Sequence, residues 1–357
     1  MKTVLHIGMS KTGSTSIQKT LTKYADRLAS QGIVYPQLTR QPHHVYLVPA
    51  VLQEDEWKRE FGVDTPENRA RVVQSSERAW AKLADIVAEA RTRGDTLIIS
   101  CEHIIGLRRP ALLRMIERLN SLGLEIAPKA YVRSPTSHFL SASQQLLKYS
   151  AQIKPPTTEL RYRIKLNRFG DLPVEPLNVR VFARSQLEQE RVVRDFLHNS
   201  TGVAIDSLGD FEVVSDNESL SAEGMALMQD FNQTVFPDGA PFGNALSKKV
   251  LALVGEADRA FGNTKPRLHD HLRALLARRH ASDIAWLKEM HGLTFDDLGD
   301  IDLAGAPAID AADVPALGLV SDLVTVDPDK LEQLTQAIFP QGARTFAETF
   351  RAGTRAA

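Results

Sequence analysis

The sequence predicts an α/β fold, in which a parallel sheet is flanked by helices on both faces and followed by a helical C-terminal extension. Short apolar runs alternate with helical patterns over roughly the first 200 residues, which is typical of strands joined by crossover helices. The run Thr96–Ser100 is almost wholly apolar, as expected of a strand buried on both faces. Beyond about residue 217 the strand-like runs stop and helical spacing continues alone.

The expected elements follow in a regular order. Strands or extended segments are expected at 3–5, 33–36, 96–100, 126–132 and 179–182, and helices at 16–28, 67–92, 110–122, 135–149 and 189–199. Apolar residues recur at three- and four-residue spacing in the helical segments, and glycines such as Gly32 and Gly94 mark their ends. A further helix is expected at 328–338.

The end of the strand-like runs near residue 217 divides the chain, and three parts are expected. An α/β domain occupies residues 1–215, a helical extension 216–300, and a C-terminal tail 301–357 that we expect to pack on the same domain. Length alone suits one large α/β domain with an extension.

Composition indicates a soluble globular enzyme. The 357 residues are 43% hydrophobic and 24% charged, and 43 basic residues nearly balance 44 acidic ones. This balance gives no sign of a nucleic-acid partner. The single cysteine, Cys101, excludes an internal disulfide and suits a reducing compartment. With no signal-peptide pattern and no apolar stretch of membrane-spanning length, we expect a cytoplasmic protein without a membrane span.

The segment Gly8–Thr15 predicts an anion site. It joins a short apolar strand to the start of a helix, where backbone N–H groups and the helix dipole favour negative charge. Gly8 and Gly13 allow the backbone to approach an anion closely, and Lys11 adds a positive charge. An ordinary strand-to-helix turn with a solvated lysine is the alternative that this loop alone leaves open.

The loop differs from the P-loop of nucleotide triphosphatases. That motif requires lysine directly after its second glycine, where this chain has Ser14. Here the lysine, Lys11, lies three residues earlier, inside the loop. A lysine in that place approaches a phosphate from a different side.

Other polar residues are expected at the same edge of the sheet. Glu102 and His103 follow the strand at 96–100, and Arg133 ends the strand at 126–132. Carboxyl ends of parallel strands share one edge, where ligands bind. Arg133 can bind a phosphate bidentately, and Ser141, in the following helix, can reach the same anion. Taken alone, each residue is better explained as a solvated surface residue; the presence of both at the right places in one parallel sheet favours the anion site.

These features together resemble sulfotransferases that use 3′-phosphoadenosine 5′-phosphosulfate (PAPS). Lys11-Thr12-Gly13-Ser14-Thr15 resembles their 5′-phosphosulfate loop, and the Arg133–Ser141 pair resembles their 3′-phosphate element. The stretches IISCEHI, VRVFARSQL and VVRDFL are similar to segments of a bacterial-type branch of this family. The resemblance covers roughly residues 1–235. It implies a P-loop NTPase-like sulfotransferase fold, PAPS as co-substrate and no metal.

The resemblance also implies roles for individual residues. Lys11 would bind the oxygen between sulfur and the 5′-phosphate, while Thr12, Gly13, Ser14 and Thr15 would hold that phosphate. A general base would accept the acceptor's proton, with Glu102 preferred, His103 second and the His43–His44 pair third. A structural carboxylate that caps a helix or pairs with Arg108 is an equally weighted alternative for Glu102. His6 is expected to pack under the loop and Cys101 to be buried.

The expected function is transfer of a sulfuryl group to a hydroxyl or amine of an acceptor, for which a carbohydrate is one candidate class. Residues 37–66, 151–177 and the helical C-terminal third are expected to shape the acceptor pocket. One departure is the absence of the R-K-G-x-x-G run of cytosolic sulfotransferases, for which Arg184, Arg267 and Arg273 are candidate replacements. The alternatives are a small-molecule kinase with a degenerate P-loop and a non-catalytic nucleotide-binding protein. Four C-terminal histidines are expected at the surface: His269, His271, His280 and His291.

Overall fold

The computed structural model describes residues 1–57, 65–204, 206, 212–213, 219–239, 244–261, 265–299, 301, 303 and 316–339. It divides into two compact units. The sheet unit comprises Met1–Arg133, Arg161–Asp216 and Asp283–Phe295, and the helical unit comprises Ser134–Leu160, Asn217–Ser282 and Asp296–Ala357. The boundaries expected at 215 and 300, and most of the expected tail 301–357, lie outside the described residues.

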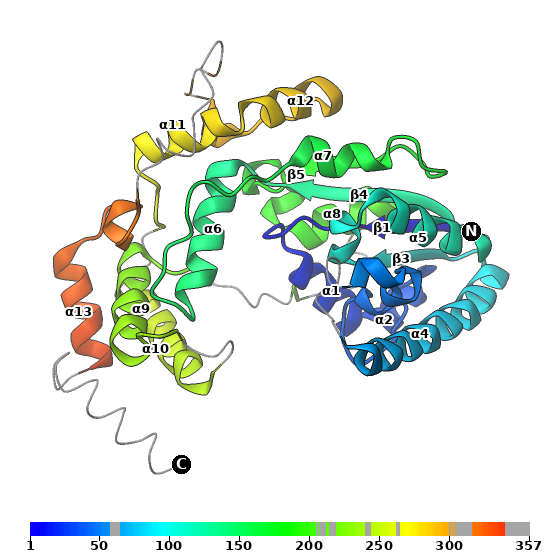
Figure 1. Cartoon of the computed structure of the whole chain (residues 1–357), viewed down its shortest axis with the longest axis horizontal. Helices are drawn as coiled ribbons and strands as arrows, with labels where there is room; N and C mark the ends of the chain where they lie inside the picture. The colour runs from blue at the N-terminus through cyan, green and yellow to red at the C-terminus, as the bar shows by residue number, and fades with distance from the viewer. Residues whose placement is uncertain are drawn as a thin grey trace. The chain divides into compact units, whose positions relative to one another are not determined.

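A five-stranded parallel sheet forms the centre of the sheet unit, which confirms the predicted α/β class (Figure 1). The strand order is β2-β3-β1-β4-β5. The strands are β1 (Lys2–His6), β2 (Ile33–Val34), β3 (Thr96–Ser100), β4 (Glu125–Val132) and β5 (Asn178–Val181). β1 lies in the middle, with Val4 opposite Ile98 of β3 and Ala127 of β4. The sheet therefore presents the ends of β3, β1, β4 and β5 along one edge.

Helices connect the strands in two directions across the sheet. The connection from β1 to β2 passes β3, whereas the connection from β3 to β4 passes β1 in the opposite direction. Because parallel crossovers are right-handed, the two connections run over opposite faces. The helices of this unit are α1 (Ser14–Lys23), α2 (Ala25–Ala29), α4 (Pro66–Arg93), α5 (Arg109–Ser121), α7 (Tyr162–Leu166) and α8 (Val192–Thr201), with α12 (Ala281–His291) falling mostly within it.

Two of the expected helices differ from the structure at their ends. The helix expected at 16–28 is divided at Tyr24 into α1 and α2. The helix expected from Gln189 begins only at Val192, because Gln189 and Glu190 have left-handed backbone with φ of 48° and 60°. By contrast α4 ends at Gly94, which adopts the left-handed conformation expected of a helix-terminating glycine.

One face of the sheet is covered by α1 and α8. Their side chains share a hydrophobic core with Val4, Ile98 and Tyr131 from three neighbouring strands. The core includes Ile17 and Leu21 of α1, and from α8 Val193, Phe196 and Leu197. Burial of these apolar groups fixes both helices against the strands whose ends carry the candidate site.

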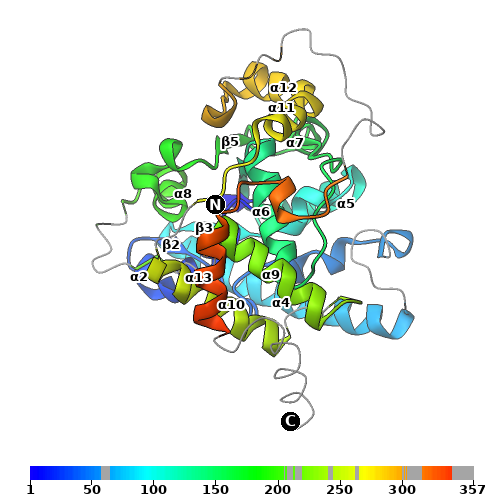
Figure 2. The same ribbon diagram turned by 90° about the vertical axis from the view of Figure 1, so that its left-hand side faces the viewer.

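The helical unit has a core of its own. It contains α6 (Pro135–Leu147), α9 (Ala222–Val235), α10 (Ala245–Phe261), α11 (Asp270–Arg279) and α13 (Pro328–Ile338). Figure 2 shows α9, α10 and α13 packed side by side, and α6 and α11 also contact each other. The helix expected at 328–338 is confirmed, and Asp327 caps its first turn. No described helix is long and apolar enough to cross a lipid bilayer.

The expectation that His280 lies at the surface is wrong. His280 is buried in the helical unit, where its ring accepts the backbone N–H of Leu160 and contacts the carbonyl of Leu276. Its polar atoms connect the end of α11 to the segment before α7, so burial costs it no hydrogen bonds.

Candidate functional site

The candidate site begins with the loop that joins β1 to α1. Lys11 and Gly13 both have left-handed backbone, with φ of 65° and 79°, and Gly13 is the residue before the first turn of α1. The Thr12 hydroxyl donates to the carbonyl of Met9 at 2.6 Å. Thr12 therefore braces the loop from within, and the first turn of α1 has no side-chain cap. The backbone N–H groups of that turn suit an anion.

Close packing explains both glycines of the loop. A Cβ atom on Gly13 would lie 2.9 Å from Phe182 and 2.9 Å from Val192, and its positive φ disfavours a side chain independently. A Cβ atom on Gly8 would lie 2.4 Å from the Ser14 hydroxyl oxygen and 3.0 Å from Glu102 Cγ. The loop is thus held between the ends of β3 and β5.

Ser14 presents a buried hydroxyl that the described residues do not satisfy. The residue is 3% exposed, and its Oγ makes no hydrogen bond of normal geometry with a described residue. It lies near enough to Glu102 to lower the pKa of that carboxyl. A buried polar group without a partner costs stability, so its position at a helix start suits a ligand. Thr15, by contrast, is exposed.

Glu102 follows β3 at the start of a 3₁₀ helix, η4 (Glu102–Gly106). Burial raises the pKa of its carboxyl, and Ser14 and the positive charge of Lys11 act in the opposite direction. It forms no ion pair with Arg108 or with any other residue that the structure describes. The geometry therefore does not support the alternative in which Glu102 is a structural carboxylate paired with Arg108. A half-buried carboxyl with a raised pKa is a better proton acceptor near neutral pH.

The histidines of this region fall into two groups. His103 is exposed, and partial desolvation together with the neighbouring His43 lowers its pKa. His44 is buried, and its Nδ1 accepts the backbone N–H of Ser100 at 2.8 Å while its Nε2 donates to the carbonyl of Pro36 at 2.7 Å. Burial lowers the pKa of His44 to about 4. With both ring nitrogens used, His44 is a structural residue, whereas His103 and His43 are accessible to solvent.

His6 lies beneath the loop, as predicted. Its side chain is fully buried, and burial lowers its pKa to about 4. Its Nδ1 lies 2.8 Å from the Ser100 hydroxyl, which also accepts Gln18 Nε2 at 3.1 Å. Cys101 is buried as well, and burial raises its pKa to about 12, so its thiol is not an activated nucleophile.

Arg133 joins the loop to the ends of β4 and β5. Its guanidinium donates to the carbonyl of Lys11 at 3.1 Å and lies over the Phe182 ring, 5.3 Å from the centroid. The Arg133 carbonyl accepts the hydroxyl of Tyr162. The sheet unit thus brings Lys11, Glu102, His103 and Arg133 to one edge of the sheet.

Ser141 belongs to α6, in the helical unit, where it is half-buried. Its pairing with Arg133 around one anion stays a prediction. At the start of the same helix, Ser134 and Thr136 both donate to the carboxylate of Asp297, at 2.6 Å and 2.5 Å. A carboxylate at a helix N-terminus is electrostatically favourable.

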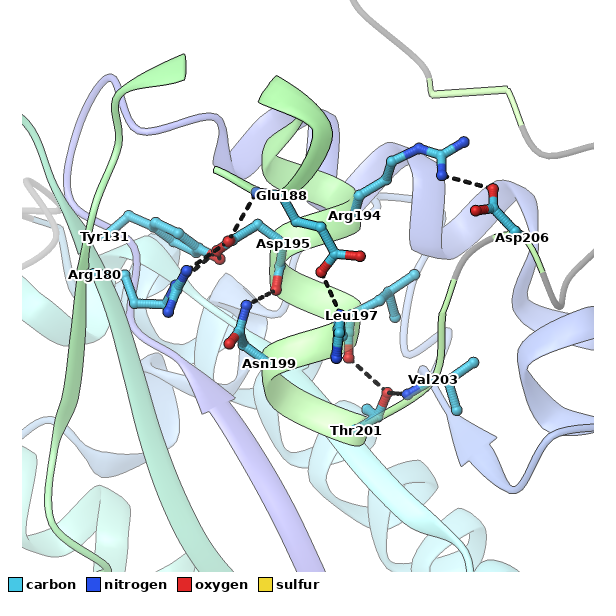
Figure 3. Close-up of polar contacts among 11 residues, drawn as sticks. Tyr131, Arg180, Glu188, Arg194, Asp195, Leu197, Asn199, Thr201, Val203 and Asp206 are labelled. Atoms are coloured by element: carbon cyan, nitrogen blue, oxygen red, sulfur yellow. Dashed lines mark hydrogen bonds and ion pairs between the residues drawn. The ribbon is translucent and has the colours of Figure 1, made fainter. Parts of the chain in front are cut away.

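A buried carboxylate, Asp195 of α8, holds the ends of β4 and β5 (Figure 3). It is fully buried and accepts the Tyr131 hydroxyl at 2.6 Å. The Arg180 guanidinium donates to both oxygens of Asp195, at 2.8 Å and 2.7 Å. The backbone N–H of Glu188 also donates to Asp195, at 3.1 Å. Tyr131 and Arg180 each lie two residues before a site residue, namely Arg133 and Phe182. Asp195 therefore orients the strand ends that contact the loop.

The candidate replacements for the missing basic run lie in different units. Arg184 follows β5 in the sheet unit and is exposed. Arg267 and Arg273 belong to the helical unit, where both pair with Asp270. Arg273 also donates to the carbonyl of Asp297 at 2.7 Å.

Sequence reasoning assigned no role to Phe182 or Asp195. A signal for Asp195 was present, because a carboxylate interrupts the apolar face of Val192, Val193 and Phe196 in a short helix. Phe182 gave no such signal, since its role depends on its contact with Gly13.

No protein-family model matches the chain, and comparisons with curated proteins and with solved structures find none that is similar. Among the residues described, no group of three or more histidine, cysteine or acidic side chains is arranged to hold a metal ion.

Proposed function

We propose that this chain is a PAPS-dependent sulfotransferase with a P-loop NTPase-like sulfotransferase fold. The observation that carries the proposal is the contact between Arg133 and the Lys11 loop. It joins a helix start that suits one phosphate to an arginine that suits a second, at the carboxyl edge of a parallel sheet. A donor with a 5′-phosphosulfate and a 3′-phosphate has two such anionic groups.

The loop fits a phosphate on its own geometry. Gly8 and Gly13 have no space for a side chain, and the Ser14 hydroxyl is buried without a hydrogen-bond partner of normal geometry among the described residues. The backbone N–H groups of Thr12 to Thr15 and the Ser14 hydroxyl would hold the 5′-phosphate. Arg133, with Ser141 as the predicted second residue, would bind the 3′-phosphate. PAPS, when bound, supplies the sulfuryl group and leaves as adenosine 3′,5′-bisphosphate.

Two side chains of the sheet unit would assist the transfer. Lys11 offsets negative charge on the leaving phosphate, which is the group whose charge increases in the transition state. Glu102 accepts the proton of the acceptor hydroxyl or amine, because its partial burial raises its pKa and it lies beside Gly8 of the loop. His103 is the second candidate for this role. The strand order supports a shared site for the Lys11 loop and Glu102. They follow the adjacent strands β1 and β3, whose connections run over opposite faces of the sheet.

Replacement of Lys11 tests the leaving-group role. We expect Lys11→Ala to lower the turnover of radiolabelled PAPS about 100- to 1000-fold, while affinity for adenosine 3′,5′-bisphosphate falls less than about tenfold. Rapid quench measures turnover and calorimetry measures affinity. Lys23→Ala is the control, because Lys23 lies at the far end of α1, where it forms an exposed ion pair with Glu212 and lies over the Tyr24 ring. Equal losses of turnover and affinity in Lys11→Ala would remove the assigned role.

A further inference from the structure

The sheet unit carries a basic cluster beside the candidate general base. It consists of Arg108, Arg109, Arg161, Lys165 and Arg168. Arg168 donates to the carbonyls of Gly106 and Leu107, at 3.3 Å and 2.7 Å, and so fastens the segment after α7 to the end of η4. Helix α7 itself also packs against η4.

The members of the cluster lie next to one another. Partial burial lowers the pKa of Lys165, and the charges of Arg168 and Arg161 lower it further, whereas Asp283 acts in the opposite direction. Arg109 donates to the carbonyl of Arg168 at 2.8 Å. Arg108 directly follows Leu107, whose carbonyl Arg168 binds. The charges of Arg161, Lys165 and Arg168 therefore lie close together, which is unfavourable unless solvent or an anion screens them.

Acidic residues compensate this charge only in part. Asp171 lies 3.9 Å from Arg109 with a side chain that is almost fully exposed. The Asp283 carboxylate accepts the backbone N–H groups of Tyr162 and Arg163, and therefore mainly caps α7. Arg109 and Arg168 also donate to backbone carbonyls, which carry no formal negative charge. Lys165 and Arg108 form no ion pair with any residue in the described part of the chain.

The cluster begins close to the expected site of chemistry. It is anchored to Gly106, and Glu102 starts the same 3₁₀ helix. At a rise of roughly 2 Å per residue, the two ends of η4 lie about 8 Å apart. A molecule of a few sugar rings spans that distance while one of its groups reaches Glu102.

From this arrangement we infer that the acceptor is an anion, a molecule that carries carboxylate or sulfate groups, and that the basic cluster binds it. The inference rests on the proposed function, because it concerns the second substrate of the same site. Arginine and lysine bind such groups by charge-assisted hydrogen bonds. The overall balance of charge in the sequence conceals this local excess.

Anionic and neutral oligosaccharides of equal length test the inference. The probes are fluorescein-labelled hexagalacturonate, a heparin hexasaccharide and maltohexaose, and the readout is fluorescence anisotropy on the full chain at low and high salt. We expect both anionic probes to bind at least about tenfold more tightly than maltohexaose, with binding that weakens as salt screens the charges. The double variant Arg108→Gln/Lys165→Gln should bind them about fivefold to tenfold more weakly.

The control variant removes the same charge elsewhere on the sheet unit. Arg78→Gln/Lys288→Gln replaces two exposed cations and should bind the probes like wild type. Undiminished binding by the Arg108/Lys165 variant, or equal binding of maltohexaose, would overturn the inference. So would tighter binding of hexathymidylate than of either anionic sugar, since that would indicate a nucleic-acid surface.

A separate titration with adenosine 3′,5′-bisphosphate keeps the two proposals apart. Both variants should bind the bisphosphate with wild-type affinity, because neither removes a residue of the loop. If wild type fails to bind the bisphosphate, the proposed function fails. If it binds the bisphosphate but no anionic sugar, only the inference about the acceptor fails.

Discussion

At the scale of single residues, Glu102 combines the properties expected of a functional group. Its carboxyl is partly buried, has a raised pKa and forms no ion pair with a described residue, and it lies beside Lys11 and Ser14. Such an environment reduces the stability of the folded protein at neutral pH, because burial disfavours the charged form. A residue that serves only structure has no reason to retain that cost.

Replacing Glu102 should therefore stabilise the protein. A raised pKa means that the folded state prefers the protonated carboxyl, so stability falls as pH rises through that pKa. Glu102→Gln removes the ionisable group, and we expect its melting temperature to exceed that of wild type at pH 7 to 8 and to approach it near pH 4. Differential scanning calorimetry at several pH values measures this difference.

Glu77→Gln provides the opposite sign as a control. Hydrogen bonds from Arg118 lower the pKa of Glu77, so ionisation of Glu77 stabilises the folded protein. Its replacement should leave the melting temperature unchanged or slightly lower at neutral pH. A Glu102→Gln protein that is less stable than wild type at pH 7 would indicate that Glu102 is a structural carboxylate.

Part of the site could be predicted at this scale and part could not. Local sequence placed Lys11 and Gly13 in the loop, because glycine spacing and a helix start are short-range signals. It could not separate His44 from His103. His44 becomes structural through Ser100 and Pro36, and the contact with Ser100 joins residues 56 positions apart. Such contacts exist only once the sheet has formed.

At the scale of elements, α8 connects the sheet to the loop. Its first residue, Val192, packs against Gly13, and its buried Asp195 binds Tyr131 and Arg180. One helix therefore positions two of the strand ends that contact the loop, those of β4 and β5. The helix was predicted three residues too early, because the left-handed residues 189 and 190 come directly before it.

Loss of the Asp195 charge should weaken this arrangement. Asp195→Asn replaces one acceptor oxygen with a donor that faces Tyr131 or Arg180, so we expect the free energy of unfolding to fall by about 3 kcal/mol. Urea denaturation measures the change. Affinity for adenosine 3′,5′-bisphosphate should fall as well, because Arg133 and Phe182 lose their support.

Asp206→Asn is the matched control for that variant. Asp206 also pairs with an arginine of α8, Arg194 at 2.7 Å, but its side chain is 69% exposed. The loss should be less than about 1 kcal/mol. Similar losses in the two variants would show that burial of Asp195 is not what matters.

At the scale of the whole molecule, strands and helices that alternate along the sequence form a parallel sheet. The carboxyl edge of that sheet brings the residues of the candidate site together. Alternating strands and helices predicted the α/β class, and short buried runs such as 96–100 predicted individual strands correctly. The order β2-β3-β1-β4-β5 was not predictable, because it depends on which strand edges pair. That order brings the loop after β1 next to Glu102 after β3 and Arg133 after β4.

The division into two units leaves the second half of the proposed donor site as a prediction. Arg133 ends one stretch of the sheet unit, whereas Ser141 lies in the helical unit. The sequence motif links them only by spacing. The donor site should therefore be tested by binding to the full chain.

Calorimetric titration of the full chain with adenosine 3′,5′-bisphosphate distinguishes a PAPS site from an ATP site. We expect micromolar binding in the presence of a chelator, and loss of that binding in Arg133→Ala. The same titration with ATP and magnesium should give much weaker binding. Tight binding of ATP with magnesium, together with no binding of the bisphosphate, would contradict the account and favour a kinase.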